Sequence, residues 1–192
     1  VSDRPRDILP TIYSRVQRIQ VKRLPDETVA RYLTANYDIT DSDAMAVAHI
    51  AEGNVVKALE VMDRSKETAE FFDMFVKLMR LAYQKNVAEL RQWGDDLASM
   101  GRDREMRFYE YAMRMVRENF VYNFNVPEIN YMTSTEEQFS VRFARFITVD
   151  NVERIIDVFD RARTDIAGNA NGKIVNLDVA IKVIMLLLPK KQ

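Results

Sequence analysis

The sequence predicts a mainly helical, all-α protein, and three observations support this class. Only 5 of its 192 residues are glycine and 5 are proline, whereas 10 are methionine, a composition that suits uninterrupted helices. From Leu24 onward, apolar residues recur at helical spacing. Candidate capping sequences, such as residues 40–43, lie between these apolar stretches. We therefore expect helices throughout the chain after residue 23.

Residues 1–23 contain the single exception to this pattern. Residues 7–12 are typical of a short helix, and residues 17–22 then alternate polar and apolar side chains as a strand does, with Ile19 and Val21 on one face. A single strand is not stable by itself. We therefore expect its partner strands to lie in a preceding part of a longer protein.

Residues 24–65 are predicted to form a compact unit of three short helices. Pro25 followed by two acidic residues is typical of a first helical turn. Residues 40–43 have the spacing of a capping box and would open the second helix. Gly53 suits the end of that helix, and Asn54 suits the cap of the third.

Residues 66–192 are predicted to form a second, larger helical bundle, because the helices lengthen and become rich in aromatic residues near Ser65. We expect a capping box at residues 134–137. The apolar content of this region exceeds what one small bundle needs, which favours a role in assembly. The predicted apolar face of the last helix consists of Ile174, Leu177, Ile181, Ile184 and Leu188.

Composition limits the partners and the location of the protein. Its 28 basic and 29 acidic side chains give a net charge of −1, which argues against a dedicated nucleic-acid domain. The absence of cysteine excludes disulfides, thiolate zinc sites and cysteine nucleophiles, and it favours an intracellular location. The longest apolar stretch, residues 174–189, contains polar residues and is too short to span a membrane. We expect a cytoplasmic protein without a membrane partner.

The sequence contains no common catalytic motif. It has no P-loop, glycine-rich phosphate loop, G-x-S-x-G or H-E-x-x-H segment. His49 is the only histidine and is predicted to be a surface or packed residue. The acidic pairs Asp95–Asp96 and Glu136–Glu137 are predicted to be solvated at helix ends. We therefore expect no metal site and no bound cofactor.

The arginines on the predicted helix after Gly101 allow two interpretations. Arg107 and Arg114 share a helix face and have Tyr109 and Tyr111 between them, an arrangement that could contact nucleic-acid phosphates. Acidic residues are mixed into the same segment, and this favours an ion-paired, solvated face. The arginines concerned are Arg102, Arg104, Arg107, Arg114 and Arg117.

The segment DILPTIYSRVQRIQVKRLPDETVARYL, followed by AHIAEGNVVKALEVMD, resembles subunits of the AAA+ clamp loaders. In that family a short helix ending in Ser-Arg-Cys precedes a strand and a three-helix lid. Ser14, Arg15 and Val16 match this triplet, with valine in place of cysteine. The resemblance covers residues 1–65 well and, more weakly, extends to the family's helical collar. It implies that residues 1–23 end an AAA+ core whose P-loop lies upstream, that residues 24–65 form the lid and that residues 66–192 form the collar.

The resemblance also implies roles for individual residues. ATP-hydrolysing subunits of the family carry a sensor 2 arginine in the third lid helix, and Val56 occupies that position here. Valine has no donor for a γ-phosphate, so a non-hydrolysing subunit is implied. Arg15, next to Ser14, is then the candidate arginine finger for the ATP site of a neighbouring subunit.

The partners implied by the resemblance are other clamp-loader subunits, of the gamma/tau and delta types, bound through the collar. The sliding clamp and primed DNA would be reached through the whole complex in DNA replication. No intrinsic enzyme activity is expected of residues 1–192 themselves, because polymerase activity belongs to the DNA polymerase III holoenzyme. Two alternatives stay open: an ATP-hydrolysing motor subunit of the same family, and an unrelated helical adaptor. The gene sequence upstream of Val1 would distinguish them.

Overall fold

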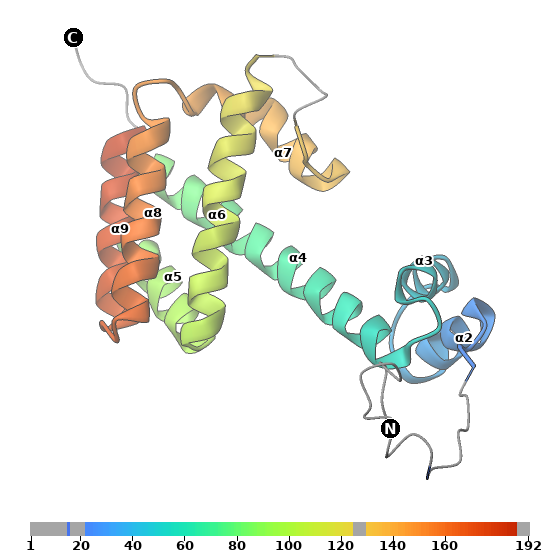
Figure 1. Ribbon diagram of the computed structural model, residues 1–192. Coiled ribbons are helices and arrows are strands. Elements are labelled where there is room, and N and C mark those ends of the chain that lie inside the picture. Colours follow the sequence, from blue (N-terminus) through green and yellow to red (C-terminus); the bar gives the residue numbers. More distant parts are fainter. Residues whose placement is uncertain (1–14, 16–21, 125–129, 188–192) are drawn as a thin grey trace. The chain divides into compact units, whose positions relative to one another are not determined.

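The computed structural model describes residues 15, 22–124 and 130–187. All regular secondary structure in these ranges is helical, which confirms the predicted all-α class (Figure 1). The predicted helix at residues 7–12 lies outside the described residues, as does the predicted strand except for its last residue. The chain divides into two compact units, a small unit, Val1–Arg64, and a large unit, Ser65–Gln192.

The small unit is built from α2 (Asp26–Asn36), α3 (Asp41–Ala51) and the first turns of α4 (Val55–Gln84). Helices α2 and α3 pack against each other, and α4 contributes two buried side chains to their shared core. Alanine dominates this core, so little apolar area is buried per residue. The buried residues are Val29, Ala30, Leu33, Ala44, Ala48, Ala51, Ala58 and Met62.

The helix ends of the small unit follow local rules. The Thr40 side chain accepts a hydrogen bond from the Asp43 N–H and caps α3, as predicted. Glu52 and Gly53 then have φ angles of 52° and 79°, in the left-handed region. A Cβ atom at Gly53 would lie 2.4 Å from the Leu24 carbonyl oxygen. Glycine is therefore required at the end of α3, as the sequence indicated.

Helix α4 is longer than the sequence predicted. The third helix was expected to be short and to end before the change of composition near Ser65, but α4 continues for 30 residues to Gln84. The stretch between Val55 and Gln84 contains neither glycine nor proline. Nothing in it therefore ends a helix, and the change in composition marks a change in what the helix packs against.

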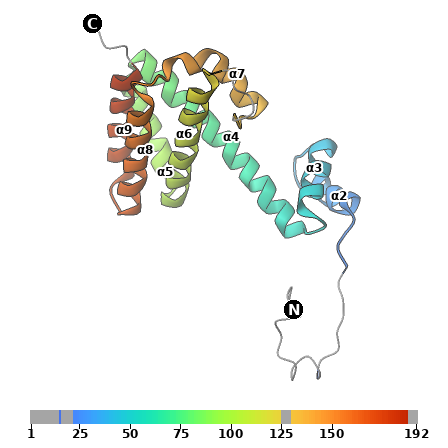
Figure 2. The same ribbon diagram turned by 45° about the horizontal axis from the view of Figure 1, so that its top comes forward.

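In the large unit, α5, α6, α8 and α9 lie side by side in both views (Figures 1 and 2). Helix α6 packs on α8, α5 packs on α9, and α8 packs on α9, while α7 and the short 3-10 helix η3 contact α6. The bounds are α5 (Val87–Ser99), α6 (Arg102–Tyr122), α7 (Ser134–Phe143), η3 (Ala144–Phe146), α8 (Val152–Ala167) and α9 (Gly172–Leu187).

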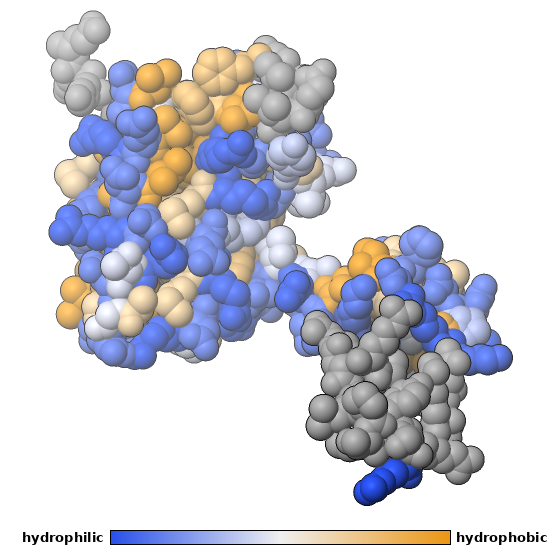
Figure 3. Space-filling view, in the orientation of Figure 1, coloured by the Kyte–Doolittle hydropathy of each residue, from blue (hydrophilic) through white to orange (hydrophobic). Residues whose placement is uncertain are grey.

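The core of the large unit is aromatic. The rings of Phe71 and Trp93 meet Phe108 edge-on, each with its centroid 5.9 Å from that of Phe108. The buried Trp93 Nε1 donates a hydrogen bond to the Met74 carbonyl at 3.0 Å. Outside this core, the face drawn in Figure 3 is mainly hydrophilic, with apolar residues gathered in the upper part of the large unit. The buried aromatic residues are Phe71, Phe75, Trp93, Phe108, Tyr109, Tyr111, Phe143 and Phe159.

The predicted apolar face of α9 is only partly buried, with Ile184 packed against the core. Ile174 is 69% exposed and Ile181 is 42% exposed, while Leu188 lies outside the described residues. Helix α9 is apolar on nearly all sides, so its periodicity could not specify which face is buried. Its outer face leaves Ile174, Ile181 and Met185 exposed to solvent. The residues that face the core are Asn176, Val179, Ala180, Val183 and Leu187.

The capping box of α7 begins one residue earlier than predicted. The Thr133 side chain accepts from the Glu136 N–H at 3.3 Å, and the Glu136 carboxylate accepts from the Thr133 N–H at 2.8 Å. Both residues 133–136 and residues 134–137 have the required spacing. The earlier register is the one that turns the Glu136 side chain inward.

Candidate interaction sites

Val56, the residue at the sensor 2 position of the resemblance, lies in the first turn of α4 and is 66% exposed. The Asn54 Oδ1 atom accepts hydrogen bonds from the N–H groups of Val56, at 3.0 Å, and Lys57, at 3.2 Å. These N–H groups at a helix start are ones that could bind a phosphate. Because Asn54 occupies them, neither they nor the valine side chain offers a donor to an anion.

Arg15 lies in a turn and is exposed. It forms no ion pair or hydrogen bond with any other residue that the structure describes. Ser14, the other residue of the predicted finger motif, lies outside the described residues. An exposed guanidinium with no partner among the described residues is able to reach a group outside its own chain, but no described contact joins Arg15 to Val56.

His49 is a surface residue, as expected. Its side chain is 85% exposed, and its Nδ1 atom lies 3.2 Å from an Asp26 carboxylate oxygen. Among the residues in the described ranges, no group of histidine and acidic side chains could hold a metal ion. Asp95 and Asp96, predicted to be solvated, are partly exposed and lie 3.6 Å from Lys173 Nζ and 3.2 Å from Lys77 Nζ respectively.

Four of the five arginines of α6 form ion pairs, which confirms the ion-paired interpretation for Arg104, Arg107, Arg114 and Arg117. Arg107 Nη2 lies 2.8 Å from a Glu67 carboxylate oxygen, and Arg104 pairs with Glu67 and with Glu70. Hydrogen bonding from Arg107 holds the pKa of Glu67 below its ordinary value. The tyrosine rings between these arginines are buried, so they offer no surface on which a base could stack.

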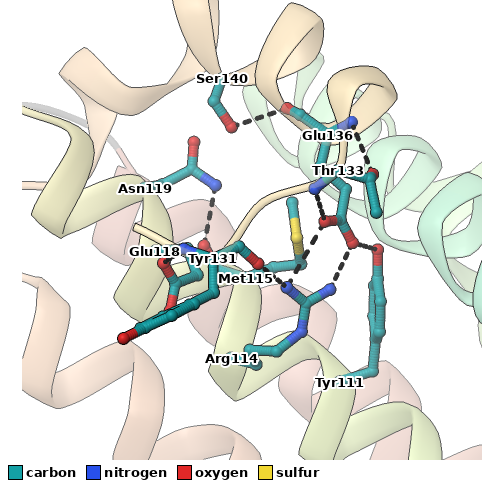
Figure 4. Close-up of polar contacts among 9 residues, drawn as sticks. All are labelled: Tyr111, Arg114, Met115, Glu118, Asn119, Tyr131, Thr133, Glu136 and Ser140. Atoms are coloured by element: carbon teal, nitrogen blue, oxygen red, sulfur yellow. Dashed lines mark hydrogen bonds and ion pairs between the residues drawn. The ribbon is translucent and has the colours of Figure 1, made fainter. Parts of the chain in front are cut away.

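Glu136 corrects another prediction, because it is buried and not solvated (Figure 4). The Tyr111 hydroxyl donates to its carboxylate at 2.7 Å, Arg114 forms an ion pair with it, and the Thr133 N–H donates to it. Burial alone raises the pKa of this carboxyl. Hydrogen bonds from Arg114, Thr133 and Tyr111 outweigh burial and leave the pKa below its ordinary value.

A second carboxylate fastens the segment before α7 to α6 (Figure 4). Glu118 accepts a hydrogen bond from the Tyr131 N–H at 2.8 Å. It also pairs with Arg117 at 2.7 Å. The Asn130 side chain donates to the Glu118 carbonyl at 3.2 Å. Residues 130 and 131, which precede the Thr133 cap of α7, are thereby held on α6.

Asn176, on the buried face of α9, is the centre of another polar cluster. Its Oδ1 accepts from the Tyr109 hydroxyl at 2.7 Å, and its Nδ2 donates to the Gly94 carbonyl at 2.9 Å and to Glu105 at 2.8 Å. Burial raises the pKa values of Glu105 and of Tyr109. The cluster joins α5, α6 and α9, so its role is to fix the packing of the bundle.

An open groove of about 780 Å³ lies within the large unit, lined by α4, α7, η3 and the end of α9. Sequence reasoning did not find it, because its lining comes from elements far apart in the chain. We call it the aromatic groove. Its lining residues are Val76, Met79, Arg80, Tyr83, Gln138, Phe139, Val141, Arg142, Phe143, Arg145, Phe146 and Leu187.

No protein-family model, curated protein or solved structure matches this chain. Among the helices in the described ranges, none is both long and apolar enough to cross a membrane. The residues and their contacts are therefore the basis for assigning a function.

Proposed function

We propose that this chain is part of a non-hydrolysing AAA+ clamp-loader subunit, of the delta-prime type found in the bacterial DNA polymerase III clamp loader. One observation carries the proposal: a Ser14–Arg15 pair precedes a three-helix unit whose third helix has Val56 in place of the sensor 2 arginine. An arginine finger without sensor 2 is the combination expected of a subunit that assists hydrolysis by a neighbour.

The surroundings of Val56 support the non-hydrolysing assignment. Phosphoryl transfer needs donors that stabilise the charge on the γ-phosphoryl oxygens. Val56 is exposed at the start of α4 but has no donor, and Asn54 already occupies the N–H groups of Val56 and Lys57. The lid of this subunit therefore contributes nothing to hydrolysis in its own site.

Arg15 acts on the ATP of the adjacent motor subunit. A guanidinium is planar, is always charged and binds phosphate oxygens with two parallel hydrogen bonds. Arg15 is exposed and has no carboxylate partner among the described residues, so its charge is available to another chain. Ser14 precedes it in the family motif and contributes to its placement.

The large unit assembles with gamma/tau-type and delta-type subunits as a collar, and the complex then acts on the sliding clamp and primed DNA in the cytoplasm. This part of the proposal is supported by the outer face of α9, where Ile174, Ile181 and Met185 are exposed. Contiguous apolar surface is typical of interaction sites, because burying it drives association.

The test is single-turnover ATP hydrolysis by the reconstituted complex, with Arg15→Ala in the full-length subunit. We expect normal assembly on gel filtration and a loss on the order of a thousandfold in one ATP site only, the usual scale for an arginine finger. Arg15→Lys should restore little, because an ammonium lacks the bidentate geometry. Arg31→Ala, at an exposed position of α2, is the matched control. Equal small effects of Arg15→Ala and Arg31→Ala would contradict the proposal.

A further inference from the structure

The aromatic groove has the size and lining of a binding site. Its volume of about 780 Å³ lies within the roughly 300–1,000 Å³ typical of ligand sites. Met79, Phe143 and Leu187 line it and are buried, while Tyr83 and Val141 are 58% and 64% exposed. An apolar side chain that enters the groove therefore meets apolar side chains both inside it and at its edge.

The charge of the groove is uncompensated. Arg80, Arg142 and Arg145 line it, and its lining contains no acidic residue. None of these three arginines has a carboxylate at ion-pair distance among the described residues, and Arg145 instead lies over the Phe146 ring, 4.9 Å from its centroid. The arginines of α6 differ, because Arg104 and Arg107 are both paired with glutamates.

We propose that the aromatic groove binds an acidic, amphipathic peptide segment of a partner protein. Apolar side chains of the segment occupy the groove, and its carboxylates pair with Arg80, Arg142 and Arg145. Charge complementarity carries the choice of occupant, since three arginines without a carboxylate partner among the described residues favour an anionic partner. The inference does not depend on the clamp-loader proposal, because it uses only residues of the large unit.

A single-stranded nucleic acid is the other anionic candidate, and the rings of the groove argue against it. Sequence-tolerant binding of single strands uses accessible ring faces on which successive bases stack. Phe139 and Phe143 stack on each other, with centroids 4.7 Å apart. Tyr83 is exposed, but its ring is tilted against Phe146 at 5.2 Å. The rings are thus engaged with one another, and the groove offers no row of free faces.

The binding test uses fluorescence polarisation of labelled synthetic peptides with the full chain. The probe has leucine and phenylalanine at helical spacing and aspartate or glutamate at the remaining positions. One control peptide keeps the apolar residues but has lysine in place of each acid, and an oligothymidylate serves as the nucleic-acid control. We expect only the acidic peptide to bind, and its affinity to fall with added salt.

Substitutions at the edge of the groove then locate the site. Arg142→Glu and Arg145→Glu should each weaken the acidic peptide by roughly tenfold or more, because each replaces attraction by repulsion. Arg154→Glu makes the same charge change at an exposed position of α8 outside the groove, and it should change the affinity little. Circular dichroism checks that every variant is folded.

The peptide and substitution experiments can overturn the proposal in four ways. These are no binding of acidic peptides, equal binding of the lysine peptide, competition by oligothymidylate, and equal effects of Arg142→Glu and Arg154→Glu. Self-association of the chain that Arg142→Glu abolishes would also overturn it, since the occupant would then be a second copy. The peptide test measures binding by the large unit, whereas the Arg15 test measures ATP hydrolysis by the complex, so the two proposals fail independently.

Discussion

The small and large units bury different kinds of side chain in their cores. Five of the eight buried core residues of the small unit are alanines, whereas the core of the large unit contains Trp93, Phe108 and several other buried rings. The large unit also buries Glu105, Glu136 and Asn176. The small unit therefore depends on close helix contact, while the large unit depends on matched shapes and on hydrogen bonds among buried polar side chains.

The largest expected effect is in the aromatic core. Phe108 is fully buried, so Phe108→Ala should lower the free energy of unfolding of the large unit by about 3–5 kcal/mol. Leu33→Ala, also at a fully buried position, should cost the small unit about 2–5 kcal/mol. Trp93 is the only tryptophan and lies in the large unit. Urea unfolding followed by its fluorescence therefore reports that unit, and circular dichroism reports both.

If the two units unfold separately, Phe108→Ala should shift the fluorescence transition, which reports the large unit. Leu33→Ala should leave the fluorescence transition unchanged and should shift only the part of the circular-dichroism transition that comes from the small unit. A conservative Phe108→Leu change is the control and should cost less. Equal shifts of both signals for both alanine variants would show that the two units unfold as one cooperative structure, which would contradict the division drawn above.

The sequence predicted the parts of the fold that depend on short-range patterns. Thr40, Gly53 and Asn54 were predicted to define helix ends and do so, because a cap needs only residues a few positions apart. The same reasoning failed at α7, where two overlapping four-residue spacings both fit and only burial of Glu136 decides between them. It also failed at α4, where a change of composition near Ser65 does not end the helix.

The features that the sequence did not predict depend on contacts between residues far apart in the chain. Asn176 lies on the buried face of α9 because Tyr109, Glu105 and Gly94, all distant in sequence, satisfy its amide. No local pattern could show this, so the apolar periodicity of α9 selected a face that is only partly buried. The aromatic groove was missed for the same reason. Of the candidate site residues, Arg15 and Val56 were predicted from the resemblance to a family, and the structure adds their exposure.

Two of the buried glutamates of the large unit, Glu136 and Glu105, should respond to pH in opposite directions. Glu136 has a pKa below the ordinary value near 4.5, so its folded form binds protons less readily than the unfolded chain. Its stabilisation is complete above pH 4.5 and is lost as pH falls through the folded-state pKa. Glu105 has a raised pKa. Stability from its protonated form is complete below pH 4.5 and is lost as pH rises through its folded-state pKa.

Glutamine substitutions test these signs. Glu136→Gln should destabilise the large unit at neutral pH and should remove part of its loss of stability in acid. Glu105→Gln should be neutral or stabilising at neutral pH, because the amide oxygen still accepts from Asn176. Glu137→Gln, at an exposed neighbour, is the control. The measurement is urea unfolding, followed by Trp93 fluorescence, across a pH series. Parallel pH profiles for Glu105→Gln and Glu136→Gln would contradict the assignment.

The smallest expected effects on stability come from removing one helix cap in each unit. Asn54 Oδ1 accepts two backbone hydrogen bonds in the small unit, from Val56 and Lys57, and Asn54→Ala removes both. In the large unit, Thr133→Ala removes only the bond from the Glu136 N–H, while the Thr133 N–H still donates to the Glu136 carboxylate.

Loss of a cap costs about 0.5–2 kcal/mol. We therefore expect Asn54→Ala near the upper end of this range and Thr133→Ala near the lower end, each seen in the unfolding transition of its own unit. Asn54→Ser and Thr133→Ser keep an acceptor oxygen and should restore most of the loss. A larger cost for Thr133→Ala would mean that its side-chain bond positions the Glu136 carboxylate for Arg114 and Tyr111, and combining Thr133→Ala with Glu136→Gln would then give less than the sum of the two separate losses.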